Sequence, residues 1–284
     1  MPLRFPRLPG DDAREEEVKP SVDPVIERVA DTGSTNDDLL ARVHAATAAG
    51  VATFAPCLLV ADRQRAGRGR HGRRWHAEPA ASLTFSIAWP CARGDLSGLS
   101  LAIGSALADT LDPPSAAARI GVKWPNDLWL VDPAQGGAAE RGRKLAGVLV
   151  ETLAFGAGRV AVIGIGINIT RHPVPDAASG FASLDEIDPD ATPVSVLDRV
   201  APAMFDALRR FDRAGWAEFA TAYARRDLLR GRRIAGAGAA GAIEGIAAGV
   251  DADGSLLVAT PAGTVPVRSG EWHLARAEPA GSPC

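Results

Sequence analysis

Between Ser82 and Trp89, large apolar residues alternate with small or polar ones, and this pattern constrains the fold more than any other feature of the sequence. Leu83, Phe85 and Ile87 share one face of an extended chain, because successive side chains of a strand point to opposite faces. Such a strand needs partner strands beside it and an apolar layer against its apolar face. The chain is therefore built around at least one sheet.

Shorter patterns predict the other elements. Apolar runs predict a short strand near residues 25–29 and further strands over 57–61, 120–124, 128–131, 145–153 and 160–167. Apolar residues at helical spacing predict one helix capped by Ser34, one over about 96–111, and two marked by 197–208 and 216–223. Asp253-Gly254 predicts a hairpin turn between two short apolar runs.

The pattern changes near residues 228–231, where we expect a domain boundary. Residues 1–22 contain many charges and prolines and are expected to form a flexible leader. Residues 23–228 form the main domain, residues 229–278 a small β-barrel of short strands, and residues 279–284 a tail.

Composition excludes several classes. The 284 residues carry a net charge of −3, so duplex nucleic acid is not an expected partner. Cys57, Cys91 and Cys284 are far apart and odd in number, which argues against a disulfide framework or a structural zinc site and favours the cytoplasm. No apolar run of about 18 residues is present to cross a membrane.

The densest chemical signal is the arginine loop, residues 62–75, which holds six arginines and three glycines. Glycines let backbone amides approach an anion, and guanidinium groups bind phosphate or carboxylate through paired hydrogen bonds. An anion-binding loop and a solvated basic loop, which could contact nucleic acid, are equally compatible with this composition.

Three further motifs are weaker by themselves. Lys123 ends an apolar strand before a Trp-Pro-Asn-Asp turn, although such a position is more often an ordinary strand end. Lys144 opens another strand, where a lysine can stabilise a developing anion or simply point into solvent. Gly164 and Gly166 lie inside a strand without the third glycine of a dinucleotide fingerprint, so another backbone or a ligand is expected close by.

The order of these motifs resembles one family. The chain runs Ser34-Thr35-Asn36, Gln64, the Gly-Arg-Gly-Arg of residues 67–70, Lys123-Trp-Pro-Asn-Asp127, Lys144-Leu-Ala-Gly147 and Gly164-Ile-Gly-Ile-Asn168. In this order and spacing, over about residues 25–276, the motifs resemble those of the biotin protein ligases. The resemblance implies an α+β fold, with a mixed-sheet catalytic domain like that of class II synthetases and a C-terminal SH3-like barrel.

The resemblance also implies a two-step reaction. Biotin and ATP, which brings Mg2+ on its phosphates, give biotinyl-5′-AMP, and a lysine of a biotin carboxyl carrier domain of acetyl-CoA carboxylase or a related carboxylase then takes the biotinyl group. Lys144, Arg68 and Lys123 are the implied catalytic residues, and no protein-held metal is expected. The implied ligand-binding residues are Ser34, Thr35, Asn36, Gln64, Gly67, Arg68, Gly69, Arg70, Trp75, Lys123, Asn126, Asp127, Lys144, Gly147, Gly164, Gly166, Asn168 and Phe181.

The sequence departs from the family pattern in places. His71 stands where the loop often has another arginine, and the segment 132–143 is long. Only about thirty residues precede Ser34, so we expect no DNA-binding domain and no repressor function. Three alternative functions remain: a lipoate–protein ligase, a biotin sensor without catalysis and a nucleic-acid-binding module. Neither DNA nor a membrane is an expected partner, and a homodimer is left open beside a monomer.

Overall fold

The computed structural model describes residues 24–113, 118–132, 142–174, 180–238 and 241–275. Its larger sheet has seven strands, from edge to edge β1 (Val25–Thr32), β2 (Cys57–Gln64), β3 (Ser82–Cys91), β7 (Gly158–Asn168), β6 (Arg143–Phe155), β5 (Asp127–Leu130) and β4 (Ile120–Lys123). The pair β1–β2 is parallel and the other pairs are antiparallel. The mixed sheet expected from the resemblance is therefore confirmed.

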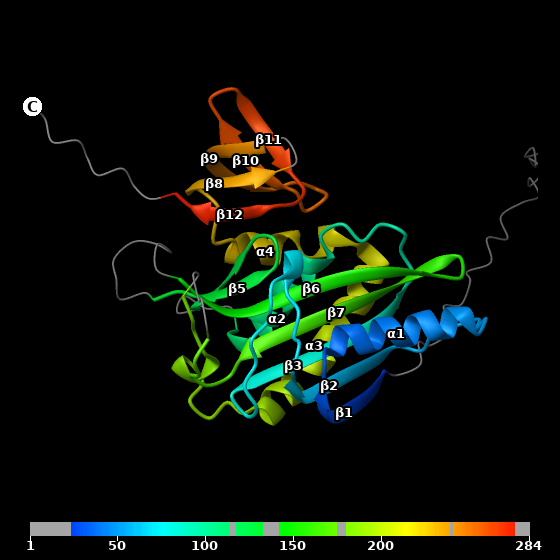
Figure 1. Ribbon diagram of the computed structural model, residues 1–284. Helices are drawn as coiled ribbons and strands as arrows, with labels where there is room; N and C mark the ends of the chain where they lie inside the picture. Colours follow the sequence, from blue (N-terminus) through cyan, green and yellow to red (C-terminus); the bar gives the residue numbers. More distant parts are fainter. Residues whose placement is uncertain (1–23, 114–117, 133–141, 175–179, 239–240, 276–284) are drawn as a thin grey trace, which may run out of the picture.

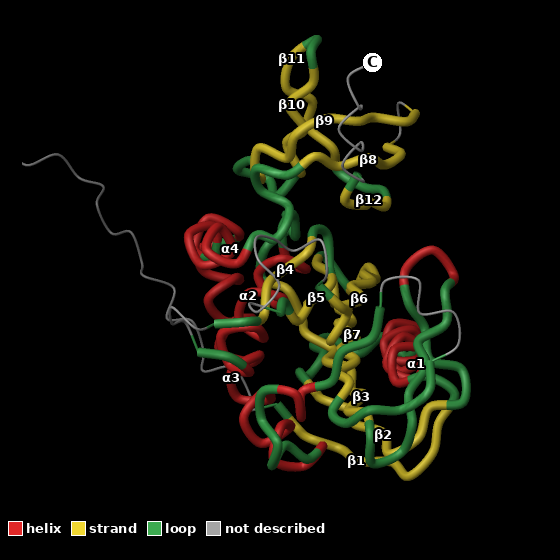
Figure 2. The backbone as a smooth tube through the Cα atoms, turned by 90° about the vertical axis from the view of Figure 1, so that its left-hand side faces the viewer, coloured by secondary structure: helices red, strands yellow, loops and turns green. Residues whose placement is uncertain are grey.

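Four α-helices cover the two faces of this sheet. They are α1 (Thr35–Ala48), α2 (Leu99–Leu111), α3 (Pro193–Ala214) and α4 (Ala220–Arg226). Figure 2 shows α1 on one side of the sheet and α2, α3 and α4 on the other. Within the described part of the chain, no helix combines the length and the apolar character needed to span a lipid bilayer.

The C-terminal part forms a second, antiparallel sheet, seen at the top of Figure 1. Its order is β11 (Gly263–Val267), β10 (Leu256–Thr260), β9 (Gly241–Val250), β8 (Arg233–Gly238) and β12 (Glu271–Leu274). This sheet occupies the region where a small β-barrel was expected. The indole of Trp124 donates to the carbonyl of Gly254 at 3.0 Å and fastens the second sheet to the first.

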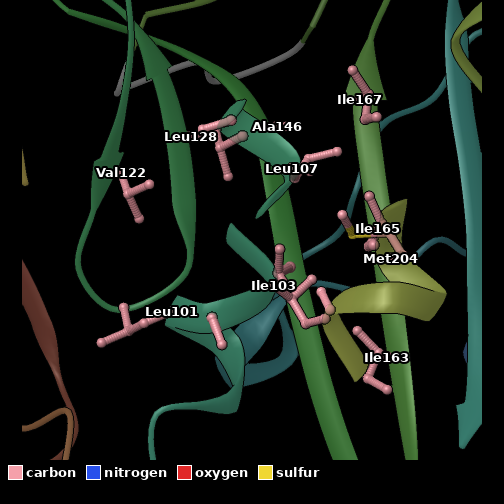
Figure 3. Close-up of a cluster of buried hydrophobic side chains, with 14 of the residues drawn as sticks. Leu101, Ile103, Leu107, Val122, Leu128, Ala146, Ile163, Ile165, Ile167 and Met204 are labelled. Carbon is pink, nitrogen blue, oxygen red and sulfur yellow. The ribbon is translucent and has the colours of Figure 1, made fainter. Parts of the chain in front are cut away.

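Strand β7 shows how one sequence pattern serves both faces of the large sheet. Ile163, Ile165 and Ile167 are buried in the larger apolar cluster with α2 and α3 (Figure 3). Val160 and Val162 point the opposite way, into a smaller cluster with α1. The period of two residues thus places two apolar layers against a single strand.

The alternation in β3 separates two buried faces. Leu83, Phe85, Ile87 and Trp89 enter the larger cluster, and the polar residues Ser82, Thr84 and Ser86 are also buried. Thr84 and Ser86 line the pocket described below. A half-polar strand usually has one solvated face, so only the covering layer explains these buried hydroxyls.

Most predicted elements are present with shifted ends. Ser34 caps α1, and the Asp37 amide donates to its hydroxyl at 3.4 Å. The second helix begins only at Leu99, after Gly98 in the left-handed region (φ 76°). The last predicted helix is split into a short 3-10 turn, Trp216–Glu218, and α4.

The predicted Asp253-Gly254 turn is confirmed, and the side chain of Asp251 accepts hydrogen bonds from the amides of Asp253 and Ser255 at 2.9 Å each. β8 and β12 were not predicted. The leader, the tail with Cys284, and residues 133–141 lie outside the described residues, and the boundary near residue 228 stays a prediction.

Candidate active site

A pocket opens on the α1 face of the large sheet, beside the start of α1 and beneath the arginine loop. The predicted site residues that line it are Ser34, Thr35, Asn36, Gln64, Arg68, Gly69, Arg70, Trp75, Lys123, Asn126, Asp127, Lys144, Gly147, Gly164 and Gly166. These residues come from segments scattered between positions 34 and 166. The fold therefore brings the quoted motifs together around one cavity.

One end of the pocket is a hydrogen-bonded polar cluster. The amide of Thr35 donates to Oε1 of Gln64 at 2.8 Å, and the hydroxyls of Thr35 and Ser86 are 2.7 Å apart. The Ser86 hydroxyl donates to Oδ1 of Asn36 at 2.5 Å. Because these groups are partnered, and all but the half-buried Gln64 are buried, their orientation is fixed before any ligand enters.

Two glycines of β7 shape the pocket by leaving room for side chains. A Cβ on Gly164 would lie 2.3 Å from Oδ1 of Asn36, and one on Gly166 would lie 2.3 Å from Cε2 of Trp75. Contacts this short cannot form, so a side chain at either position would force Asn36 or Trp75 to move. The neighbours are the side chains of Asn36 and Trp75, whereas the sequence led us to expect a backbone or a ligand.

The other end of the pocket is basic. Lys123 and Asp127 are directly opposed residues of β4 and β5, so their side chains share one face. The Lys144 ammonium lies 2.7 Å from Oδ1 of Asp127, and Nη1 of Arg70 donates to Oδ1 of Asn126 at 3.3 Å. Three cations thus surround one carboxylate.

A bulge in β6 places Lys144 in this basic end. Trp129 pairs with Lys144 and Leu128 with Ala146, which leaves Leu145 as the extra residue. Lys144 and Gly147 would face opposite sides of a regular strand. With the bulge they share a side, and a Cβ on Gly147 would lie only 3.5 Å from the Lys144 ammonium.

Burial makes the basic end receptive to an anion. Burial lowers the pKa of Lys123, whose side chain is 9% exposed, while Asp127 acts in the opposite sense. Burial likewise lowers the pKa of Arg70. The Lys123 ammonium also lies 4.4 Å from the centre of the Trp129 ring, a favourable cation–π contact. A charged group that loses water in this way gains from an anionic ligand.

Arg68 differs from Arg70 in its surroundings. Its guanidinium contacts Asp37 and pairs with both carboxylate oxygens of Glu151, at 2.9 and 3.2 Å. Burial opposes the charge, but the hydrogen bond to Asp37 and the attraction of Glu151 outweigh it, so the pKa of Arg68 is raised. Arg68 lines the pocket with its charge already balanced, and its catalytic role stays a prediction.

Three predicted residues lie outside this lining. Gly67 packs under Trp75, whose carbonyl would lie 2.6 Å from a Cβ there. Asn168 donates to the carbonyl of Ala182 at 3.0 Å and so supports the segment beside Lys144. Phe181 lies with Arg143, Arg171, His172, Pro173, Ser183 and Glu186 around a separate cavity.

Other lining residues were not predicted from the sequence. Arg73, Arg74, Thr84, Ser86 and Trp124 belong to recognised motifs, and the polar face of β3 was a signal for Ser86. Gly270, Glu271, Trp272 and His273 reach the pocket from the second sheet, and Arg73 contacts Glu271. No local pattern could have found these four, because only the docking of the two sheets brings them there.

Among the residues that the structure describes, no three His, Cys, Asp or Glu side chains gather as metal ligands would. Asp127 is engaged by Lys144. The arrangement offers a hydrogen-bonded polar end, an aromatic wall and a basic end, which suits an elongated ligand with an anionic terminus.

The chain is similar to known proteins of one family. A model of the biotin/lipoate A/B protein ligase family matches residues 53–168, and a model of the biotin protein ligase C terminal domain matches residues 231–271. The chain is 26% identical to a biotin protein ligase from Aquifex aeolicus solved in complex with biotin and ATP. That superposition has a TM-score of 0.69 and covers 89% of this chain and 99% of that one.

Curated relatives extend this similarity. The chain is 38% identical over 182 residues to the biotin–[acetyl-CoA-carboxylase] ligase of Mycobacterium tuberculosis, covering 62% of this chain and 57% of that protein. It is 33% identical over 224 residues to the bifunctional ligase/repressor BirA of Escherichia coli, covering 77% and 66%. It is 32% identical over 214 residues to the biotin–[acetyl-CoA-carboxylase] ligase of Paracoccus denitrificans, covering 72% and 85%. The matches thus span less than two thirds of the first two relatives and most of the third.

Proposed function

The chain belongs to the biotin protein ligase family, and we propose that it joins biotin to a lysine of a biotin carboxyl carrier domain through biotinyl-5′-AMP. The observation that carries this proposal is the two-ended pocket. Its hydrogen-bonded polar end fits a ureido head, its aromatic wall fits an apolar chain, and its basic end fits a carboxylate beside a phosphate.

In the first step, a carboxylate oxygen of biotin attacks the α-phosphorus of MgATP, and pyrophosphate leaves. Two anions must approach each other, so the barrier falls when fixed positive charge lies between them. Lys144, Lys123 and Arg70 provide that charge from three different segments around Asp127. Strand register and the β6 bulge set the positions of Lys123 and Lys144, and the hydrogen bond to Asn126 holds Arg70, which limits reorganisation during the reaction.

In the second step, the carrier lysine attacks the acyl carbon of the adenylate, an amide forms, and AMP leaves. The mixed anhydride must be kept from water until the carrier arrives. The arginine loop lies over the pocket, and Glu271 of the second sheet contacts Arg73 of that loop. We assign shielding of the intermediate to this loop together with the edge of the second sheet.

The nucleotide is placed toward Asn126 and Asp127, with its base toward Phe181. Phe181 forms a bridge with Lys144 through the backbone, so its cavity lies next to the basic end. The ring of Phe181 packs edge-on against His172 at 4.9 Å, and Arg143 and Arg171 line the same cavity. An aromatic ring among cations suits an adenine attached to phosphates.

The test is an intact-mass assay on a carrier domain. The purified protein is mixed with MgATP, an unmodified carrier domain and either biotin or lipoate. We expect a mass gain of one biotinyl group that requires ATP, and no gain with lipoate. A gain with lipoate alone would refute the biotin assignment, and tight biotin binding without transfer would favour a sensor.

Two variants connect this assay to the site. Lys144→Ala removes a cation from the basic end and is expected to slow pyrophosphate release about 10²- to 10³-fold. Arg63→Ala removes an exposed charge from the start of the arginine loop and is expected to leave the rate unchanged. Equal rates in both variants would show that Lys144 is misassigned.

A further inference from the structure

Glu151 connects the arginine loop to the polar end of the pocket, through Arg68 and Asn36. It lies on β6, and its carboxylate accepts three hydrogen bonds. Arg68 supplies two of them, at 2.9 and 3.2 Å, and the Asn36 side-chain amide supplies the third at 3.0 Å. The Glu151 side chain is 26% exposed, so the interaction is partly shielded from water.

Asp37 completes a clamp around the same guanidinium. Arg68 contacts Oδ1 of Asp37 in the first turn of α1 and both oxygens of Glu151 on β6. The arginine loop is thereby connected to a helix and a central strand at a single side chain. A planar guanidinium paired with both oxygens of a carboxylate also fixes direction, since rotation breaks one of the two bonds.

The arginine loop also makes hydrogen bonds within itself, besides the contacts of Arg70 with Asn126 and of Arg73 with Glu271. The Trp75 amide donates to the carbonyl of Gly67 at 2.9 Å, and the Gly69 amide to the carbonyl of Arg73 at 2.8 Å. These two hydrogen bonds make the segment a small hairpin. Its base is anchored where the amides of Arg65 and Ala66 donate to the carbonyls of Thr32 and Gly33, so the Arg68 clamp restrains the next part of the hairpin.

We propose that Glu151 is a positioning residue that holds the arginine loop over the pocket through Arg68. Asn36 connects this clamp to the polar end, because its Nδ2 donates to Glu151 while its Oδ1 accepts from Ser86. Arg68 then acts as an anchor, and Arg70 and Lys123 remain the cations for the ligand. This inference rests on the proposed function only for its catalytic consequence, because the clamp itself needs no ligand.

The test compares Glu151→Gln with a matched control that breaks another ion pair of the arginine loop. Asp31 pairs with Arg65 at 2.7 Å, but that pair is more exposed, at 40% and 70% of the two side chains. Asp31→Asn thus removes an ion pair of the loop without touching the clamp. The first readout is the rate at which trypsin cuts the ligand-free protein between residues 65 and 74.

We expect Glu151→Gln to be cut about fivefold faster than wild type and Asp31→Asn to be cut at the wild-type rate. Arg68→Lys, which keeps the charge but loses the paired hydrogen bonds, should match Glu151→Gln and stands in for it if that variant does not fold. The double variant Glu151→Gln/Arg68→Lys should be cut no faster than either single variant, because the two substitutions remove the same interaction. Equal cleavage in all variants, or additive effects, would overturn the proposal.

The second readout concerns the adenylate. Glu151→Gln is expected to release biotinyl-AMP about fivefold faster and to raise the KM for ATP more than it lowers kcat, since the loop is loosened while Lys123 and Lys144 stay in place. If wild type forms no biotinyl-AMP, the proposed function fails while the proteolysis still decides the clamp. If wild type is active and Glu151→Gln retains adenylate normally with normal cleavage, the positioning role fails alone.

Discussion

Gly166→Ala is the sharpest steric perturbation that the pocket offers. A Cβ at this position would lie 2.3 Å from Cε2 of Trp75 and 2.6 Å from its Cζ2 and Nε1. An ordinary contact begins near 3.4 Å, so the ring must move by at least 3.4 − 2.3, about 1.1 Å. β7 cannot retreat easily, because Gly166 is paired with Thr84 of β3 and Gly147 of β6.

The loss of stability depends on whether the Trp75 ring or strand β7 moves. Overpacking in a rigid interior costs about 1–3 kcal/mol, and we expect the lower end because Trp75 belongs to a loop. That loss lowers the melting temperature by about 2–4 °C. The displaced ring no longer forms the aromatic wall, so biotin affinity is expected to fall about 10- to 100-fold, or about 1.4–2.7 kcal/mol.

Calorimetry measures both quantities, one by thermal scan and one by titration with biotin. Gly94→Ala is the matched control, since a Cβ at Gly94 would meet no atom of the described residues within 4 Å. Trp75→Val in the Gly166→Ala background should restore the melting temperature but not the affinity. Wild-type affinity and melting temperature in Gly166→Ala would refute the placement of Trp75 against β7.

Three further results are expected. Arg226→Gln should lower the free energy of unfolding, measured by urea titration, by about 3 kcal/mol, because the Arg226 side chain is 5% exposed and ion-paired. Arg225 is exposed, so the control Arg225→Gln should lower it by less than about 0.5 kcal/mol. Hydrogen bonding by Arg143 lowers the pKa of Glu186 in the folded state. The ionised carboxylate therefore stabilises the fold at pH values above its unfolded pKa of about 4.3. This stabilisation disappears as the pH falls through the lower folded pKa. Glu186→Gln should therefore flatten the acid side of a stability–pH curve, and an unchanged curve would contradict this. Lys123→Met should slow pyrophosphate release about 10²- to 10³-fold. It should not lower the melting temperature, because burial disfavours the charge that the substitution removes. A lower melting temperature would show that Lys123 has a structural role.

Local interactions explain what could be predicted from the sequence. The alternation in β3 follows from strand geometry, and the cap at Ser34 needs only the amide of Asp37 three residues later. The turn between Lys123 and Asp127 is likewise encoded within five residues. Strands with a weak apolar pattern, such as β8 with its Arg-Ile-Ala-Gly-Ala-Gly sequence, were missed because their burial depends on neighbours elsewhere in the chain.

The motif residues of the site could be named from the sequence, and their arrangement could not. The order of the motifs identified the family, since each motif is a short run of residues. The bulge that turns Lys144 and Gly147 to one side depends on how β5 and β6 pair. The clamp between Arg68 and Glu151 joins residues 83 positions apart, and Glu271 comes from another sheet.

The strands with strong patterns, the helix cap, the turns and the set of chemical groups could be inferred without a structure, because these follow from interactions between residues a few positions apart. The folded structure was needed to show that the hydroxyl face of β3 is covered, that Arg68 is neutralised while Arg70 and Lys123 remain available, and that the second sheet adds residues to the pocket lining. Those outcomes depend on strand register and on the packing of distant segments, where burial and charge are set by neighbours that no local pattern specifies.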